Sequence, residues 1–205
     1  MARILIITGD FSSSGQLQYS VYRMLEEGFV VPLAAPSRKG LHTVIDQREE
    51  GWDYDLEKRG YTLWPEASFN EVDPPLYDGL ILPGWRAVEA LRNVERCIII
   101  VRHFIEHNKP IASICQGPRM LIAAGVKGRR MTGLQMIKPD IVASGNTWVD
   151  AGDEPVVDGN IVTVSGRPYY HAWMRSFLSM LKQRGISSAG SQPENTGVAA
   201  PVSLS

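Results

Sequence analysis

The stretch from Lys109 to Gly125 joins a short apolar run directly to a helix-forming run through one sharp turn. It reads KPIASICQGPRMLIAAG, so the apolar run covers 111–114, the helical run covers 119–124, and Cys115 lies between them. This order predicts a buried strand, a tight turn and a helix. A strand that leads at once into a helix is the building unit of a mostly parallel sheet covered by helices.

The position of Cys115 at the vertex of this turn has a chemical consequence. The first N–H groups of a helix are free, and together with the helix dipole they favour an anion, which shifts a thiol toward its nucleophilic thiolate. The same geometry in hydrolases is called a nucleophile elbow. The next residue, Gln116, can neither take nor give a proton. The turn therefore offers a nucleophile without an adjacent base.

The rest of the chain alternates in the same way between strand-like and helix-like runs. Strands are predicted at 3–8, 29–35, 78–82 and 147–149, and helices at 16–27, from about residue 88, and at 172–183. Two β-rich runs within 156–163 flank an Asp-Gly turn, which is typical of a hairpin. The polar stretch 36–61 contains three glycines and predicts a small hairpin or an irregular excursion. The expected fold is an α/β sandwich with helices on both faces.

Composition limits the class of protein and its partners. The chain has 205 residues, 44% of them hydrophobic, and a net charge of -1, as in an ordinary globular protein. We expect one domain over 1–184 and a flexible Gly-, Ser- and Pro-rich tail over 185–205. The lack of basic excess argues against nucleic acid as a partner, and no run is long enough to span a membrane.

The two cysteines indicate the compartment. Two cysteines give no disulfide framework and suit a reducing environment, and the start ARILIITGD lacks the features of a signal peptide. We therefore expect a cytoplasmic protein. Cys97 lies in an apolar helical stretch, where the role of a small buried hydrophobe is expected.

Three loops are expected to meet at one rim of the sheet. They cover residues 9–15, 84–88 and 115–118, and each follows a predicted strand. In open α/β sheets, ligands bind outside the carboxyl ends of the strands. A site for a small-molecule substrate is therefore predicted at this rim.

Several segments together resemble one known family. LILPGWRAVEALR, KPIASICQGPRMLIAAG, IKPDIVASGNTWVD and VVDGNIVT resemble the ThiJ/PfpI superfamily, which is related to class I glutamine amidotransferases, over residues 2 to about 180. The insert TVIDQREEGWDYDLEKRGYTL resembles that of PfpI-type and plant glyoxalase III-like members. The resemblance implies a flavodoxin-like sandwich and a homodimer or a higher homo-oligomer. We expect no cofactor and no metal. Family activities include glyoxalase III, glycation repair, peptidase or amidase, isocyanide hydration and chaperone-like holding.

The chain departs from the family pattern where the chemistry lies. The resemblance implies a cysteine at the elbow, which Cys115 matches, with a glutamate from the first loop near it and often a histidine after it. The histidine position is Gln116, the acidic positions fall at Ser13 and Gln16, and the second glycine of the usual Pro-Gly-Gly turn is Trp85. Neutral residues thus replace the proton-handling ones while the thiol is kept.

Each candidate site residue has a functional and a structural interpretation. Cys115 is a nucleophile or a residue that fits the turn. The backbone N–H groups of Trp85 and Gln116 form an oxyanion hole or only satisfy the turn, and the Trp85 indole forms a wall of the pocket or fills space. The remaining expected substrate-binding positions are Ser13, Gln16, Gly84, Tyr169 and Tyr170.

His171 is the best surviving candidate for a catalytic base, since imidazole titrates near neutrality and the loop after Pro168 lies near the cysteine in family members. The alternative is that Tyr169, Tyr170 and His171 pack at an oligomer contact.

Three functions remain open. The first is a cofactor-independent enzyme that acts on a small or aromatic carbonyl-type compound by hydratase, hydrolase or lyase chemistry. The second is a non-catalytic binding or chaperone-like protein on the same scaffold, because both proton-transfer partners are replaced. The third is glyoxalase III or deglycase activity.

Overall fold

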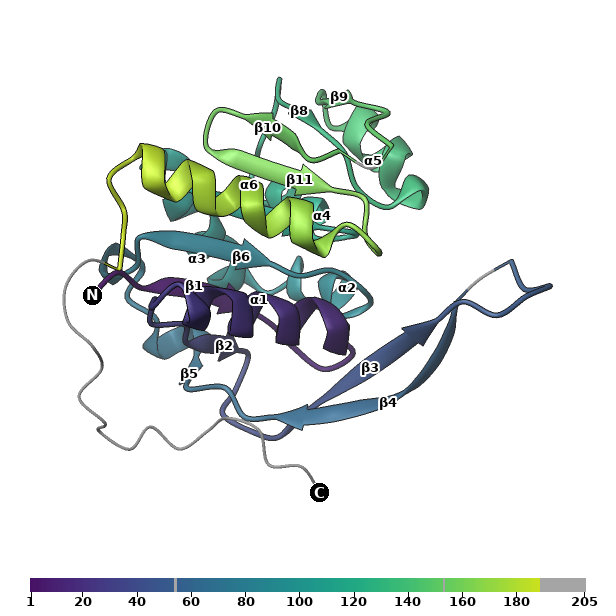
Figure 1. Cartoon of the computed structure of the whole chain (residues 1–205), viewed down its shortest axis with the longest axis horizontal. Coiled ribbons are helices and arrows are strands. Elements are labelled where there is room, and N and C mark those ends of the chain that lie inside the picture. Colours follow the sequence, from purple (N-terminus) through teal and green to yellow (C-terminus); the bar gives the residue numbers. More distant parts are fainter. Residues whose placement is uncertain (54, 153, 189–205) are drawn as a thin grey trace.

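The computed structural model of the chain shows the predicted alternation of strands and helices (Figure 1). It describes residues 1–53, 55–152 and 154–188. The strands are β1 (Ile4–Ile7), β2 (Leu33–Ala35), β3 (Leu41–Gln47), β4 (Leu56–Leu63), β5 (Ala67–Ser68), β6 (Gly79–Leu82), β7 (Ile111–Ile114), β8 (Arg130–Met131), β9 (Thr147–Trp148), β10 (Val156–Asp158) and β11 (Ile161–Val164). The helices are α1 (Ser14–Glu26), α2 (Ala87–Leu91), α3 (Glu95–Glu106), α4 (Pro118–Ala123), α5 (Lys138–Ala143) and α6 (Tyr170–Gln183).

The main sheet has seven strands in the order β10-β11-β7-β6-β1-β2-β5. All neighbours pair in parallel except β10, which is antiparallel to β11, so the predicted mostly parallel sheet is confirmed. The predicted strand at 147–149 instead pairs with β8 in a separate two-stranded sheet. In the β10–β11 hairpin Asp158 pairs with Ile161, so the turn residues are Gly159 and Asn160 rather than Asp-Gly.

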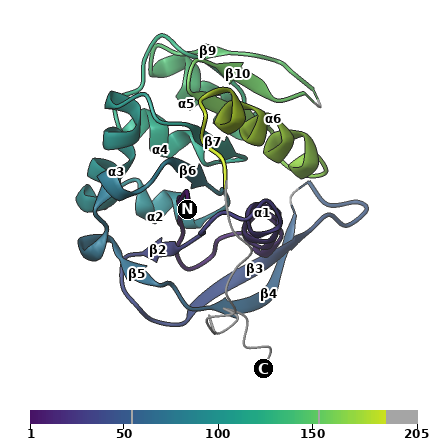
Figure 2. The same cartoon turned by 60° about the vertical axis from the view of Figure 1, so that its left-hand side comes forward.

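Helices cover both faces of this sheet, as predicted (Figure 2). Ile4 and Ile6 of β1 pack in one core cluster with residues of α1 and α6, such as Trp173, whereas Leu5 and Ile7 pack in the other cluster with α2, α3 and α4. Successive side chains of a strand point to opposite faces, so a strand buried on both sides needs an uninterrupted apolar run. That requirement explains why 3–8 shows no polar alternation.

The stretch 36–61 contributes a β-hairpin formed by β3 and β4, which projects from the body of the molecule (Figure 1). The first loop runs beside β3: the Phe11 amide donates to the His42 carbonyl at 2.8 Å, and the Val44 amide donates to the Ser12 carbonyl at 3.0 Å. One of the two expectations for this stretch, a small hairpin, is therefore confirmed. Because the first loop lies at the rim of the sheet, its hydrogen bonds to β3 place residues of this hairpin at the same rim.

The last helix of the described residues, α6, ends at Gln183, one residue before the predicted domain boundary at 184. The predicted tail falls largely on 189–205, which lie outside the described residues. Across the described part of the chain, none of the helices has the length and apolar character that crossing a bilayer requires.

Candidate active site

The three predicted loops meet at the carboxyl ends of β1, β6 and β7. Ser12 forms an antiparallel bridge with Trp85, and the Ala87 amide donates to the Phe11 carbonyl at 3.4 Å. A Cβ atom placed on Gly84 would lie 2.7 Å from the Cβ atom of Cys115. The expected convergence is confirmed, and Cys115 lies at its centre.

Cys115 adopts the elbow conformation that the sequence predicted. It follows β7 directly, its φ is 61°, and its side chain is only 3% exposed. The turn is closed by the Gly117 amide, which donates to the Ile114 carbonyl at 2.8 Å, and α4 begins at Pro118. Proline suits the first helical position because its ring fixes φ and that position needs no N–H donor.

Backbone strain is concentrated at this rim. Four non-glycine residues have positive φ within the described ranges: Phe11, Trp85, Asn108 and Cys115. Asparagine tolerates the left-handed region, but each of the other three stores on the order of 1–3 kcal/mol of strain. Those three belong one each to the three loops that converge, so the molecule keeps costly backbone conformations where the loops meet.

The Pro83-Gly84-Trp85 turn fits closely against the elbow. A Cβ atom on Gly84 would lie 2.7 Å from the Gln116 nitrogen and from the Ile114 carbonyl oxygen, so only glycine fits there. Trp85 has a φ of 77° and thus retains the backbone conformation that suits a glycine. The turn is therefore strained rather than re-routed, and its amide still faces the thiol.

The amide groups of Trp85 and Gln116 are both directed at Cys115 Sγ. Burial raises the pKa of the Cys115 thiol from 9.0 to about 11, although these two amides and the Gln16 side chain lower it by stabilising the thiolate. The negative charge of Asp46 raises it further. The resting thiol is consequently neutral at physiological pH, with donors already placed for negative charge that develops beside it.

Gln16 connects the first loop to the other two. Its Oε1 atom accepts a hydrogen bond from the Gly84 amide at 2.6 Å, and its side chain stabilises the thiolate form of Cys115. The residue is only 2% exposed. A neutral amide thus occupies one of the two positions where the family resemblance implies an acid.

A cavity of about 620 Å³ opens beside the thiol, and we call it the Cys115 cavity. Its lining includes Gln16, Asp46, Trp85, Cys115, Leu134 and Arg167. Residues 165–168, which follow β11, form one side of it. The cavity therefore combines apolar walls, one thiol and a buried carboxylate.

Asp46 is the site residue that sequence reasoning missed. It is 7% exposed and is the only charged residue among the buried side chains of the described ranges. Its Oδ1 atom accepts a hydrogen bond from Ser13 Oγ at 2.8 Å, and its Oδ2 atom lies 3.0 Å from Arg167 Nε. The sequence offered no clear signal, because Val44 and Ile45 are both apolar and β3 has an irregularity between His42 and Val44; only the structure shows Asp46 buried on the same face as Val44.

Trp85 forms a wall between the Cys115 cavity and a neighbouring cavity of about 490 Å³, and its side chain lines both. Its indole Nε1 donates to Glu57 Oε1 at 2.7 Å, and Arg86 Nε lies 2.7 Å from the same oxygen. Leu134 lines both cavities as well. The expected wall role of the indole therefore agrees with its position.

Two of the remaining predicted residues, Ser13 and Tyr170, do not belong to the lining of the Cys115 cavity. Ser13 is fully buried and donates to Asp46. Tyr170 packs against Gly15, where an added Cβ atom would lie 3.4 Å from the phenolic oxygen, and burial together with the Asp46 charge raises the Tyr170 pKa. Tyr169 precedes α6 and packs against the core cluster of α1 and α6.

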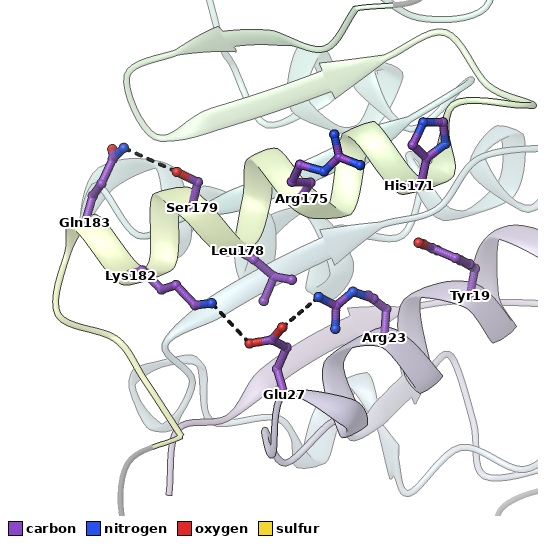
Figure 3. A pocket seen from close by; sticks show the side chains of 9 residues that line it. All are labelled: Tyr19, Arg23, Glu27, His171, Arg175, Leu178, Ser179, Lys182 and Gln183. Atoms are coloured by element: carbon purple, nitrogen blue, oxygen red, sulfur yellow. Dashed lines mark hydrogen bonds and ion pairs between the residues drawn. The ribbon is translucent and has the colours of Figure 1, made fainter.

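The expected position of His171 near the thiol is wrong. Its exposed side chain lines a different groove, of about 430 Å³, between α1 and α6, together with residues such as Tyr19, Arg23 and Arg175 (Figure 3). The cause is the start of α6 at Tyr170. Successive helical residues point about 100° apart, so Tyr170 faces inward and His171 faces the groove.

Other polar residues contact one another instead of the Cys115 cavity. Arg119 Nε lies 2.6 Å from Asp140 Oδ2, and its Nη1 donates to Gln116 Oε1 at 2.8 Å. The rings of His103 and His107 stack with centroids 4.0 Å apart. The described residues include no group of three or more His, Cys, Asp or Glu side chains that could hold a metal ion.

The amino-acid sequence matches the model of the DJ-1/PfpI family over residues 2–180. The chain belongs to the DJ-1/PfpI family. Membership agrees with the flavodoxin-like order of strands and with the cysteine at the elbow.

Similar proteins are found by both sequence and structure. A deglycase of Pyrococcus abyssi (strain GE5 / Orsay) is 40% identical over 181 residues, which cover 88% of this chain and 99% of the relative. Protein DJ-1 homolog D of Arabidopsis thaliana is 33% identical over 185 residues, which cover 87% of this chain and 47% of that protein. The structure of Schizosaccharomyces pombe DJ-1 aligns with a TM-score of 0.69 at 17% identity, over 89% of this chain and 91% of that one, and so shows the shared fold.

Proposed function

We propose that this protein is an enzyme that acts on small reactive carbonyl compounds or on the adducts that they form, without a cofactor. The observation that carries this proposal is the arrangement at Cys115: a strained elbow, two backbone amides directed at Sγ and an adjoining cavity. Backbone strain of this kind is typical of functional sites. The relatives named as deglycases, 40% identical in one case, support carbonyl adducts as the substrate class.

The chemistry begins with addition of the Cys115 sulfur to a carbonyl carbon. The S–C bond forms, the carbonyl π pair moves to oxygen, and the thiol proton leaves the sulfur. In this proposal the amides of Trp85 and Gln116, which interact with the adjacent sulfur, stabilise the negative oxygen as an oxyanion hole. For a 2-oxoaldehyde the overall change adds one water to give a 2-hydroxy acid, with one carbon oxidised and its neighbour reduced, so no external oxidant is needed.

The test compares two cysteine variants. We expect Cys115→Ala to lower the turnover of methylglyoxal, and of its adduct with N-acetylcysteine, by at least about 10³-fold, because the nucleophile is gone. Cys97→Ala is the matched control, since Cys97 is fully buried in the other core cluster. Lactate and released thiol are the readouts. Equal turnover by Cys115→Ala and Cys97→Ala would exclude a thiol mechanism.

A second candidate is a binding protein without turnover, and the raised pKa of Cys115 favours it. A thiol with a pKa of about 11 is protonated at neutral pH, and its neighbours Gln16 and Gln116 cannot remove the proton. This candidate predicts methylglyoxal adducts that bind to the wild-type protein and are not converted. Calorimetric binding without any lactate formation would support it.

A further inference from the structure

The proposed addition requires that the Cys115 proton leave as the S–C bond forms, and the residues adjacent in the chain or matched to the family acids cannot accept it. Gln116 follows the cysteine, Ser13 and Gln16 occupy the family's acidic positions, and His171 lies in another groove. A proton acceptor must therefore come from elsewhere in the lining of the Cys115 cavity.

The carboxylates of that lining are Asp46 and Asp55. Asp46 is the buried one, it lines the same cavity as Cys115, and its charge raises the pKa of the Cys115 thiol. Asp55 lies toward the rim, where its side chain is 23% exposed and interacts with Arg48 and Arg167. The burial of Asp46 and its electrostatic effect on the thiol therefore favour this carboxylate.

We propose that Asp46, supplied by the β3–β4 hairpin and held by Ser13 and Arg167, accepts the Cys115 proton during addition to the carbonyl. This inference rests on the proposed function. The proton passes from Sγ to a carboxylate oxygen, directly or through one water, while the S–C bond forms and the carbonyl pair moves to oxygen. Return of the same proton to that oxygen completes a neutral hemithioacetal, so no further reactant is needed.

The surroundings of Asp46 suit this role. Retaining a charged group in a buried position is costly unless it is paired, and here the Arg167 guanidinium and the Ser13 hydroxyl fix both carboxylate oxygens. The other charged or titratable groups that face it are Cys115 and Tyr170 below, and Asp55 and Arg48 at the rim. Arg167 bridges Asp46 and Asp55, at 3.0 and 3.4 Å, and so ties the inner carboxylate to the cavity mouth.

Asp46→Asn tests whether Asp46 accepts the proton or acts only through its charge, because the two roles predict opposite changes in turnover. We expect kcat/KM for methylglyoxal to fall by about 10²–10³-fold with a smaller change in KM. Alkylation of Cys115 by iodoacetamide at pH 8 should stay equal or become faster, since the carboxylate charge that raises the thiol pKa has been removed. If Asp46 acts only through its charge, turnover and alkylation should rise together.

Matched variants complete the experiment. Asp158→Asn removes a carboxylate of β10 that is less buried, at 28% side-chain exposure, but likewise paired with an arginine, Arg129; it does not line the cavity and should keep wild-type turnover. Asp46→Glu should recover part of the turnover, and formate should raise the turnover of Asp46→Ala at least tenfold by replacing the missing carboxylate. If Asp46→Asn fails to fold, Asp46→Asn combined with Arg167→Gln, compared with Arg167→Gln alone, avoids leaving an unpaired buried charge.

Three results would overturn the inference. They are turnover by Asp46→Asn within about threefold of wild type, equal losses of turnover and alkylation, and no response of Asp46→Ala to formate. Turnover that depends on Cys115 but not on Asp46 would refute this inference alone. Wild-type protein without turnover would refute the proposed function and this inference with it.

Discussion

Cys97 and Cys115 are two buried thiols in one small domain, and they differ in what surrounds the sulfur. Their exposed fractions are 0% and 3%. Burial raises the pKa of Cys97 to about 12, whereas the pKa of Cys115 is about 11 because two backbone amides and the Gln16 side chain partly offset the burial. Hydrogen-bond donors directed at the sulfur, rather than exposure, therefore distinguish the candidate nucleophile from the core residue.

The backbone makes the same distinction. Cys97 lies inside α3, packed in the core cluster of α2, α3 and α4, and its backbone conformation is that of a regular helix. Cys115 has a φ of 61° and lies against Gly84, with no room for an added side chain there. A structural cysteine needs only a space to fill, whereas the elbow cysteine needs a strained turn that orients donors.

Among the substitutions that test this difference between the two cysteines, Gly84→Ala should have the largest effect on stability and turnover. The added Cβ would meet the Cys115 Cβ atom, the Gln116 nitrogen and the Ile114 oxygen at 2.7 Å, and backbone atoms cannot move aside cheaply. We expect a loss of about 3 kcal/mol or more in the free energy of unfolding, together with loss of turnover. Urea unfolding measures the first effect and lactate formation the second.

The control for that substitution is Gly9→Ala. The three heavy atoms nearest to its added Cβ would all belong to the Leu91 side chain, the closest at 3.3 Å. We expect less than about 1 kcal/mol of change, because a flexible side chain can adjust. Equal effects of the two substitutions would show that the elbow does not need the close approach of Gly84.

The next largest effect should be a difference between the two thiols in their rates of alkylation as the pH is raised. The reaction of Cys115 with iodoacetamide should accelerate about tenfold per pH unit from pH 7 to 10 and level off near pH 11, because only the thiolate reacts. Cys97 should stay unlabelled until the protein unfolds. Mass spectrometry of Cys97→Ala and Cys115→Ala assigns each rate, and a plateau for Cys115 near pH 8 would contradict the raised pKa.

The same pKa predicts a smaller effect on stability. The pKa of the Cys115 thiol is about 11 in the folded protein and about 9 in the unfolded chain. Its contribution to the free energy of unfolding is therefore fully present below about pH 9 and is lost as the pH rises toward 11. Between pH 8 and 10, wild type should therefore lose about 1 kcal/mol more than Cys115→Ser. Cys97 is present in both proteins and cancels. If the free energies of unfolding of wild type and Cys115→Ser, measured with urea, change equally with pH, the pKa of Cys115 does not differ between the folded and unfolded states.

The smallest effect should come from Trp85→Phe. This change removes the hydrogen bond from the indole to Glu57 and keeps both an aromatic wall and the backbone amide. We expect about 1 kcal/mol of lost stability and a change in turnover of less than about threefold. A loss as large as that of Gly84→Ala would mean that the indole, rather than the amide, sets the reactivity of Cys115.

Local patterns predicted the parts of this site that depend on neighbours in the chain. The apolar run 111–114 became β7 with the same bounds, and the following turn placed Cys115 at the elbow. The meeting of three loops followed from the rule that parallel strands end at a common edge. The position of His171 did not follow, because the predicted helix began at 172 and left His171 in the loop, whereas α6 begins at Tyr170 and directs His171 into the groove beside α1.

The amino-acid sequence by itself determined the alternating α/β fold, the elbow and the neutral residues at the family's proton-handling positions. Each of these features depends on residues that are close together in the chain. Only the tertiary structure decided that Trp85 keeps a positive φ of 77° and that Asp46 reaches the cavity of Cys115. The physical reason is register: Asp46 is buried because β3 pairs with the first loop 33 positions away, through the Ser13–Val44 bridge and the Ser13–Asp46 hydrogen bond. No local pattern encodes such a pairing, since it depends on how the hairpin packs against the sheet rim.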